Sequence, residues 1–363
     1  MPDLSALQKH ACPACGAPAE WNPAKQRLVC PFCGTEAPFD VNAATGVIEE
    51  IDLVKALRDM PDDLRGWKAE KRSVQCQSCK AVMVFDPTRV GQNCDFCGSP
   101  ALVDYKELKD PIRPQSLLPF KVSQTQVREN IRRWYASKWF APNAFKAKAL
   151  VDTVKGVYVP YWTFDAQVHC PWWAEAGYYY YTTETFRNNQ GQTETRQVQH
   201  VRWEPASGVI DHFFDDEPVP GTQGVDAGLL RAVEPFPTTE LVPYDTAFLS
   251  GFVVEHYQIV LIDAAKRSQE QMHQKLMGLC AQQVPGDTQR NLRIDPVYSG
   301  QTFKHVLVPI WLLAYTYGAK RFQVVVNGYT GVISGQYPKS IWKILFVGLI
   351  ILVILLLVLH GTR

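Results

Sequence analysis

The segment Lys155-Gly-Val-Tyr-Val-Pro-Tyr-Trp162 recurs as Lys304-His-Val-Leu-Val-Pro-Ile-Trp311, so both copies follow the pattern Lys-x-Val-x-Val-Pro-x-Trp. Alternating β-branched and aromatic residues are typical of strands, and a proline within a strand indicates an edge or a bulge. A segment with helical periodicity precedes each copy, at Ser123–Phe140 and at Asp263–Gln282. We therefore expect a multidomain α+β chain whose β-rich body, residues 111–337, contains a duplicated helix–strand unit.

Two hairpins are predicted in this body. Tyr178–Arg187 and Gln192–Trp203 flank the turn-rich run Asn188-Asn-Gln-Gly191, and their side chains are polar on both faces. This long hairpin cannot be core, so we expect either an edge that binds a partner or a solvated arm whose edges are blunted by charge. Residues 324–334 predict a second, shorter hairpin.

Eight of the ten cysteines form four Cys-x-x-Cys pairs, and the pairs form two quartets that align at a constant offset of 64 residues. Two such turns direct four thiolates to one point, which is the tetrahedral shell that zinc prefers. The predicted ligands are Cys12, Cys15, Cys30, Cys33, Cys76, Cys79, Cys94 and Cys97. Four protein ligands leave no open coordination position, so we expect two structural zinc ions. Iron in a rubredoxin-like site has the same geometry.

The quartets divide the first part of the chain. We expect a first zinc ribbon at residues 1–46, a helical spacer at 47–72 and a second zinc ribbon at 73–110. Disulfides are disfavoured in a reducing cytoplasm, and the two remaining cysteines, Cys170 and Cys280, are expected to be isolated buried thiols.

The C-terminal segment predicts a membrane anchor. Ile344–Leu359 contains no charged or polar side chain, and Lys339 and Lys343 precede it. The N-terminus carries no secretory signal. We therefore expect residues 338–363 to form one transmembrane helix in a tail-anchored protein of the inner membrane, with the bulk of the chain in the cytoplasm.

Charge is distributed unevenly along the chain. The formal net charge is only +1, and residues 1–110 carry an acidic excess, which argues against ribbons that read nucleic acid. Residues 111–155 are strongly basic, and a contact with an anionic surface would use Arg128, Arg132, Arg133, Lys138, Lys146 and Lys148. Lipid and nucleic acid are both candidates for that surface. We favour an ordinary surface helix whose aromatic face packs on a sheet.

The sequence offers no recognisable catalytic motif. It contains no phosphate-binding G-x-x-x-x-G-K-[ST] run, no G-x-S-x-G and no H-E-x-x-H. The acidic run Asp211-His-Phe-Phe-Asp-Asp-Glu217 could hold a hard cation or an acid–base pair, with Asp211, His212 and Asp215 as the residues of such an enzyme. Prolines follow at once, so a charged turn is the better interpretation, and we expect no enzymatic activity.

Taken together, the paired ribbons, the segment Leu117-Leu-Pro-Phe120, the two Val-Pro-x-Trp strands, the turn Asn327-Gly-Tyr-Thr-Gly331 and the apolar C-terminus resemble a bacterial family. Its tail-anchored members are catalogued as transcription-factor-IIB-type zinc-ribbon proteins or as primosomal protein N′ (replication factor Y) helicase-like proteins. The helicase name does not fit, because this sequence lacks the motor motifs.

The resemblance implies an adaptor that works beside phage-shock-protein-A-like or stomatin/flotillin-like (SPFH) proteins in a membrane-stress response. We therefore expect a non-enzymatic, membrane-anchored zinc-ribbon scaffold that recruits protein partners to the cytoplasmic face of the membrane. The alternative is a nucleic-acid-binding zinc-ribbon protein tethered to the membrane.

Overall fold

The computed structural model describes residues 10–37, 48–58, 72–85, 93–96, 99, 102–104, 112–142, 154–187, 193–317 and 320–361. In chain order the elements are β1 (Glu20–Asn22), β2 (Arg27–Val29), β3 (Glu36–Ala37), β4 (Ile51–Asp52), α1 (Leu53–Arg58), β5 (Arg72–Cys76), β6 (Val82–Phe85), β7 (Leu102–Asp104), β8 (Ser116–Leu117), α2 (Gln124–Ser137), β9 (Lys155–Arg187), β10 (Thr193–Pro220), α3 (Ala227–Val233), η5 (Thr238–Glu240), β11 (Val242–Pro243), η6 (Thr246–Leu249), β12 (Val253–His256), α4 (Leu261–Gln283), β13 (Thr288–Ile294), β14 (Val297–Tyr317), β15 (Lys320–Asn327), β16 (Ile333–Gly335) and α5 (Ile341–Gly361).

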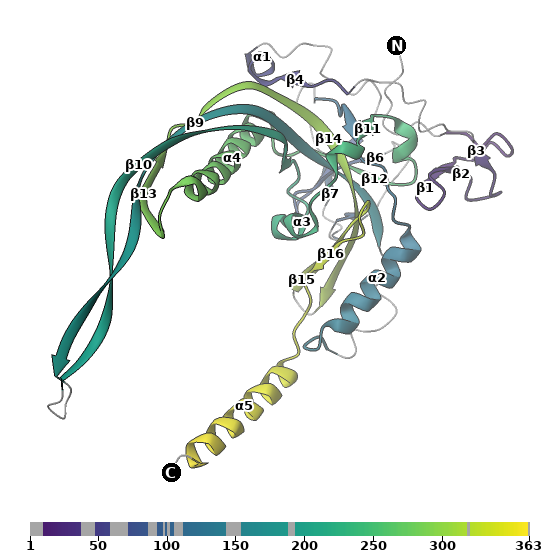
Figure 1. The fold of residues 1–363 in the computed structure, drawn as a ribbon. Helices are drawn as coiled ribbons and strands as arrows, with labels where there is room; N and C mark the ends of the chain where they lie inside the picture. The colour runs from purple at the N-terminus through teal and green to yellow at the C-terminus, as the bar shows by residue number, and fades with distance from the viewer. Residues whose placement is uncertain are drawn as a thin grey trace.

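The body is α+β and rich in β-structure, as predicted. One sheet runs in the order β11-β8-β14-β9-β12-β6-β5-β7, with β10 and β13 on β9 and with β15 on β14. Its long strands curve around helix α4, which lies on their concave side (Figure 1). A separate three-stranded sheet, β1-β2-β3, belongs to the first cysteine quartet.

The two copies of the repeated motif lie side by side at the centre of this sheet. Strands β9 and β14 pair antiparallel, and Val159 lies opposite Val308, its equivalent in the other copy. The short strand that begins each unit pairs with the other unit: β8 runs parallel to β14, and β12 runs parallel to β9. The duplicated units are therefore intertwined rather than laid end to end.

The tryptophan of each copy fixes the helix of the other copy. The indole N–H of Trp162 donates to the carbonyl of Ile259 at 2.8 Å, and that of Trp311 donates to the carbonyl of Val122 at 2.9 Å. Each of these carbonyls stands one residue before the N-cap of a helix, Val260 for α4 and Ser123 for α2. A carbonyl that is withdrawn from water in this position needs a donor, and the tryptophans supply it.

The motif prolines mark neither a sheet edge nor a bulge. Along β9 the partner β12 ends at Tyr158 and the partner β10 begins at Tyr161, so Pro160 stands where one partner replaces the other. Pro309 stands in the same way between β8 and β15 on β14. No neighbouring carbonyl needs a donor at either point, which is why a residue without an N–H fits.

A glycine binds the carbonyl of each motif proline. The N–H of Gly221 donates to Pro160 and that of Gly328 donates to Pro309, both at 2.8 Å. The carbonyl of Gly221 accepts N–H groups from the two residues before the N-cap of α4. The carbonyl of Gly328 accepts N–H groups from the two residues before the N-cap of α2. A Cβ at Gly328 would lie 2.6 Å from the ring of Phe120, so the close approach requires glycine.

Helices α2 and α4 cover different parts of the sheet. Val127, Ile131 and Tyr135 of α2 are buried in one core cluster with Trp311. Met272, Leu276 and Cys280 of α4 are buried in another cluster with Trp162. Helix α2 is shorter than the predicted Ser123–Phe140, because Lys138 adopts an extended backbone conformation.

The described part of the spacer between the ribbons, residues 48–58, contains one short helix. Its described part begins with β4, which pairs with β14, and continues as α1 with Leu53 and Ala56 buried. Residues 59–71 of the predicted helical spacer lie outside the described residues.

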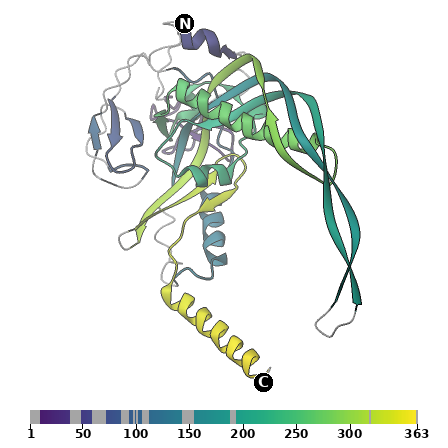
Figure 2. The same ribbon diagram turned by 90° about the vertical axis from the view of Figure 1, so that its left-hand side faces the viewer.

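Helix α5 leads away from the body (Figure 2), and its base is held where the ammonium of Lys343 donates to the carbonyls of Trp139 and Ala141 at 2.8 Å. In the part of the chain that the structure describes, no helix is both long and apolar enough to span a membrane. The predictions of a transmembrane helix at 338–363, a tail-anchored topology and an inner-membrane location are therefore wrong.

Candidate metal centres

The first quartet converges on one point. The thiols of Cys12, Cys15, Cys30 and Cys33 all lie within 4.8 Å of one another. Cys12 Sγ is 3.6 Å from Cys33 Sγ, and Cys15 Sγ is 3.6 Å from Cys30 Sγ. A tetrahedron with zinc–sulfur bonds of roughly 2.3 Å has edges of roughly 3.8 Å, so these separations suit four ligands of one ion.

The second quartet has the same arrangement in its described part. Cys76, Cys79 and Cys94 lie within 4.8 Å of one another, and Cys79 Sγ is 3.5 Å from Cys94 Sγ. Cys97 lies outside the described residues. The two clusters could each hold a metal ion and are compatible with zinc ribbons, as predicted.

The backbone explains why two residues separate the cysteines of each pair. The N–H of the first cysteine donates to the carbonyl five residues later in all four pairs, from Cys12 to Ala17, Cys30 to Thr35, Cys76 to Ala81 and Cys94 to Ser99. The chain turns through a positive φ at the residue after the second cysteine, which is Gly16, Gly34 or Lys80. Lys80 adopts this conformation at φ 66° although it is not glycine.

The surroundings of Cys33 in the first site favour the thiolate form that binds metal. The hydroxyl and the backbone N–H of Thr35 hydrogen-bond the sulfur of Cys33 and lower the pKa of this thiol to about 6. Thiolates are the form in which cysteine ligates metal ions.

Each cluster is attached to the body by specific contacts. In the first ribbon, the indole N–H of Trp21 and the side-chain amide of Gln26 both donate to the carbonyl of Phe120, at 3.3 and 2.9 Å. Trp21 also packs on Phe248 with ring centroids 4.7 Å apart. The second ribbon joins the central sheet through β6 and β12, and its buried Asp95 pairs with Lys155.

Of the six basic residues predicted for an anionic surface, four lie on helix α2 or at its C-cap. Arg132 and Arg133 are exposed on α2, and Arg133 donates to Asn130. Arg128 is half-buried, and the ammonium of Lys138 lies over the ring of Trp134 at 4.8 Å. Lys146 and Lys148 lie outside the described residues.

The acidic run 211–217 is strand and not the expected charged turn. Asp211 is exposed and accepts a hydrogen bond from His169 Nδ1 at 2.7 Å, while His212 packs edge-on against Phe214. A bulge follows between Phe214 and Glu217 and brings Asp215 and Asp216 toward Asp165. Asp211, His212 and Asp215 therefore do not converge as the residues of one active site.

Cys170 and Cys280 are buried but are not isolated, contrary to expectation. Their sulfur atoms are 3.8 Å apart, one on β9 and one on α4. Burial raises the pKa of Cys170 to about 12, so this thiol stays protonated. The sequence separation of 110 residues hides this contact from any local pattern.

Comparisons with known proteins add one relative. The chain is 23% identical over 248 residues to the uncharacterized protein YdjG of Bacillus subtilis (strain 168), and the alignment covers 68% of this chain and 70% of that protein. No family model matches the chain, and no solved structure matches it. The resemblance to the zinc-ribbon family therefore remains a resemblance, and function has to be argued from the geometry.

Proposed function

We propose that the chain is a non-enzymatic zinc-ribbon scaffold that binds a protein partner through the arm formed by residues 178–187 of β9 and 193–203 of β10. The arm extends far beyond the rest of the sheet (Figure 1). Its exposed aromatic side chains carry the proposal: Tyr180 is 49% exposed and Tyr181 is 61% exposed. Exposed tyrosines in one region are typical of protein interfaces.

The backbone of the arm supports the same role. Strand β13 pairs with β9 only as far as Gly177, and β10 pairs only with β9 among the described strands. Both outer edges of the arm therefore present N–H and C=O groups without a strand beside them. A two-stranded ribbon is marginal in water, so a partner that covers it would be favourable.

The charges of the arm favour protein over nucleic acid. Arg196 pairs with Glu184 at 2.9 Å, and Arg202 pairs with Glu204 at 2.9 Å. These guanidinium groups are already neutralised, whereas affinity for nucleic acid depends on cations that replace counterions along the phosphates.

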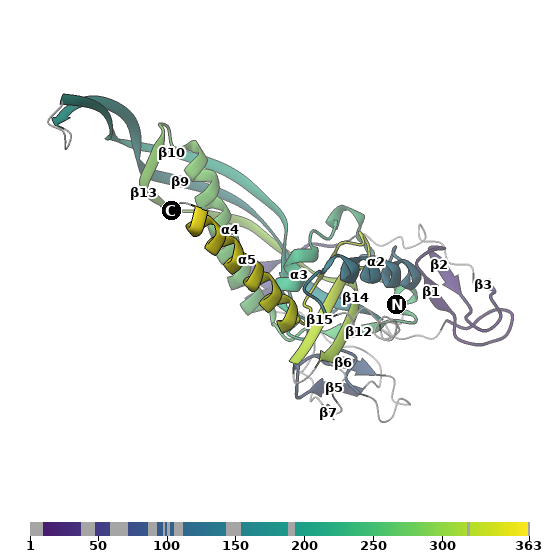
Figure 3. The ribbon, with the colours of Figure 1, turned by 90° about the horizontal axis from the view of Figure 1, so that it is seen from below.

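The metal sites act as structure in this proposal. We assign one zinc ion to each quartet, because four thiolates close the coordination shell and leave no position for a substrate. Figure 3 shows the arm and the first ribbon, β1–β3, at opposite ends of the molecule. A partner could therefore contact the arm without touching either metal site.

Affinity capture of the full chain tests the proposal. The double variant Tyr180→Ser/Tyr181→Ser should lose the captured partner, and the matched control Phe213→Ser, at an exposed aromatic of β10 outside the arm, should keep it. The family resemblance makes phage-shock-protein-A-like and SPFH-type proteins the first purified partners to test. Retention of the partner by the arm variant, or capture only of nucleic acid that salt releases, would contradict the proposal.

A further inference from the structure

A cavity of about 480 Å³ lies beside the central strands, and none of the cysteines lines it. Strands β9 and β14 form one wall, the bulge of β10 a second, and the segment that follows α3 a third. Its size is in the range of small-molecule sites, which are usually apolar with a few convergent polar groups.

The walls are mostly apolar. The rings of Tyr161 and Phe236 lie with their centroids 5.5 Å apart, and Val306 and Val308 of β14 line the same space. Pro218 and Pro235 complete this lining. Such walls suit a ligand with a hydrocarbon portion and offer aromatic faces to a cation.

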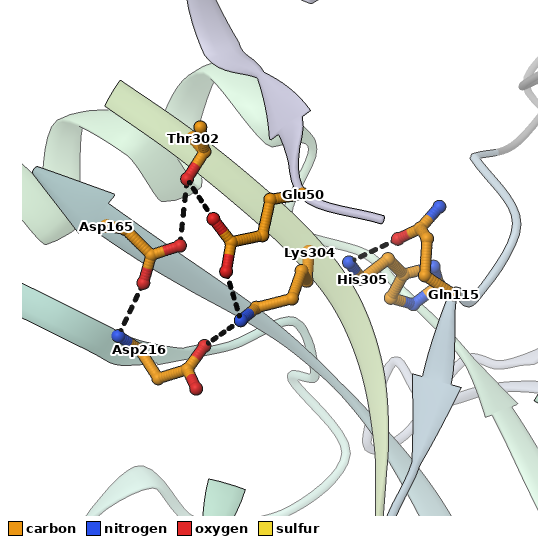
Figure 4. A network of polar contacts seen from close by, with 7 residues as sticks. All are labelled: Glu50, Gln115, Asp165, Asp216, Thr302, Lys304 and His305. Carbon is orange, nitrogen blue, oxygen red and sulfur yellow. Dashed lines mark hydrogen bonds and ion pairs between the residues drawn. The ribbon is translucent and has the colours of Figure 1, made fainter. Parts of the chain in front are cut away.

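Four carboxylates line the cavity, and lysines neutralise two of them. Lys275 Nζ lies 2.6 Å from both carboxylate oxygens of Glu217. Lys304 Nζ lies 2.7 Å from Asp216 and 3.3 Å from Glu50 (Figure 4). Glu217 and Asp216, the two of these that line the cavity, therefore already have their counterions.

The other two carboxylates form no direct ion pair in the described part of the chain. Glu234 accepts a hydrogen bond from the hydroxyl of Tyr161 at 3.2 Å, and Asp215 is exposed at the bulge. Neither forms an ion pair with a described lysine, arginine or histidine. Burial raises the pKa of Glu234, and the more distant charges of Arg231 and Lys275 offset this effect only in part.

A buried hydroxyl in the same cavity also lacks a partner. Thr163 is 2% exposed and is among the residues that line the cavity, and its buried hydroxyl makes no hydrogen bond to any described group. Buried polar groups are almost always satisfied, so an unpartnered hydroxyl beside a cavity indicates that a ligand supplies the missing bond.

A metal ion does not fit these groups. Asp165, Asp215 and Asp216 lie within 4.8 Å of one another, but Lys304 already provides the positive charge there. The two oxygens of Asp165 accept from the N–H of Asp216 at 2.7 Å and from the hydroxyl of Thr302 at 2.8 Å (Figure 4). A divalent cation would have to displace the lysine and break these bonds.

We propose that this cavity binds an organic cation, a primary ammonium group on an apolar stem. Glu234 neutralises the ammonium, the hydroxyl of Thr163 gains a hydrogen-bond partner, and the stem packs against Tyr161 and Phe236. A free amine and a lysine side chain of another protein present this same chemistry. The inference does not depend on the function of the arm.

Calorimetric titration of the full chain with n-hexylammonium tests the proposal, with hexanoate as an anion of the same length. Hexylammonium should bind with a stoichiometry of one and hexanoate should not. Glu234→Gln should weaken hexylammonium binding about tenfold or more, since a hydrogen bond to a charged group is lost. Glu240→Gln, at an exposed carboxylate outside the cavity, is the matched control and should leave the affinity unchanged.

Thr163→Val and Asp215→Asn provide a second line of evidence, and the exposed Asp215 can be changed even if Glu234→Gln fails to fold. Both should weaken binding severalfold. Comparable binding of N-acetyl-lysine amide would identify a protein side chain as the source of the cation, and binding of hexylammonium alone would identify a free amine. Equal binding of hexanoate, unchanged affinity in Glu234→Gln and Asp215→Asn, or no binding of either amine at millimolar concentration would overturn the proposal.

Discussion

Val159 of β9 lies directly opposite Val308 of β14, and the two valines hold the same position in the two copies of the repeated motif. Because the strands are antiparallel, this pair marks a local two-fold axis. Gly156 lies opposite Trp311 and Trp162 lies opposite His305, at equal distances along the strands on either side of it. Each unit therefore supplies the partner strand and the helix contact that the other unit needs.

The first prediction concerns the two motif tryptophans. Trp162→Phe and Trp311→Phe should each lower the free energy of unfolding by about 2–4 kcal/mol, because each removes buried volume and leaves the carbonyl before a helix without its donor. Because Trp162 and Trp311 make equivalent hydrogen bonds in the two copies, the two changes in unfolding free energy should be of similar size. Urea denaturation of the full chain measures both. Trp173→Phe is the control, since this side chain is 51% exposed, and a marked difference between the two motif variants would contradict the equivalence.

The second prediction concerns the buried ammonium of Lys304. Its side chain is 7% exposed and that of its partner Asp216 is 11% exposed. Lys304→Met leaves the carboxylate in a poorly solvated place, so the free energy of unfolding should fall by about 3–5 kcal/mol. Arg196→Met breaks the exposed pair with Glu184 and should cost about 1 kcal/mol or less. Equal costs in denaturant melts would show that the Lys304 pair is solvated.

The metal centres could be predicted because their signal is local. Two cysteines separated by two residues meet through a turn of the chain itself, as the bond from Cys12 to Ala17 shows. The repeat Lys-x-Val-x-Val-Pro-x-Trp likewise predicts two similar strands. Sequence alone did not predict that these strands pair with each other across 149 residues, because alternation fixes which face is buried and not which strand lies beside it.

The cavity could not be predicted at all. Thr163, Asp215 and Glu234 come from three segments that only the folded sheet brings together, and none of them stands in a recognisable motif. The prolines after the acidic run 211–217 favour a turn, whereas pairing with β9 keeps the run in the strand. The apolar C-terminus predicts a helix, which the structure contains, but hydropathy alone led to a membrane span that the described residues do not support.

The third prediction is a dependence of stability on pH through His305. Burial lowers the pKa of this histidine from 6.5 to about 3, and its ring stacks on Trp162. The unfolded chain takes up a proton first as the pH falls, so stability is full above about 6.5 and is lost between about 6.5 and about 3. The slope in this window is at most roughly 1.4 kcal/mol per pH unit.

His305→Gln removes this titration and keeps a donor for the carbonyl of Ile112, which accepts from His305 Nδ1 at 2.9 Å. The difference in unfolding free energy between the parent and the variant should therefore shrink as the pH is lowered from 7.5 to 5. All other titrating groups are common to the two chains and cancel. A difference that stays constant over this range would show that His305 is not buried as a neutral ring.

The fourth prediction separates the two metal centres. The parent should carry two zinc ions per chain by elemental analysis, and Cys30→Ser and Cys94→Ser should each keep one, because each serine removes one thiolate from a different quartet. Only Cys30→Ser should change the fluorescence of Trp21, whose indole is held against Phe120 by the fold of the first ribbon. Cys170→Ala is the control. The Cys170 thiol lies in the body, so this variant should keep both ions bound.

Lowering the pH should release zinc from the parent as protons compete for the thiolates. Two ions retained by Cys94→Ser would remove the second quartet from the metal-binding residues, and iron in place of zinc would identify the alternative that the same four-sulfur geometry allows.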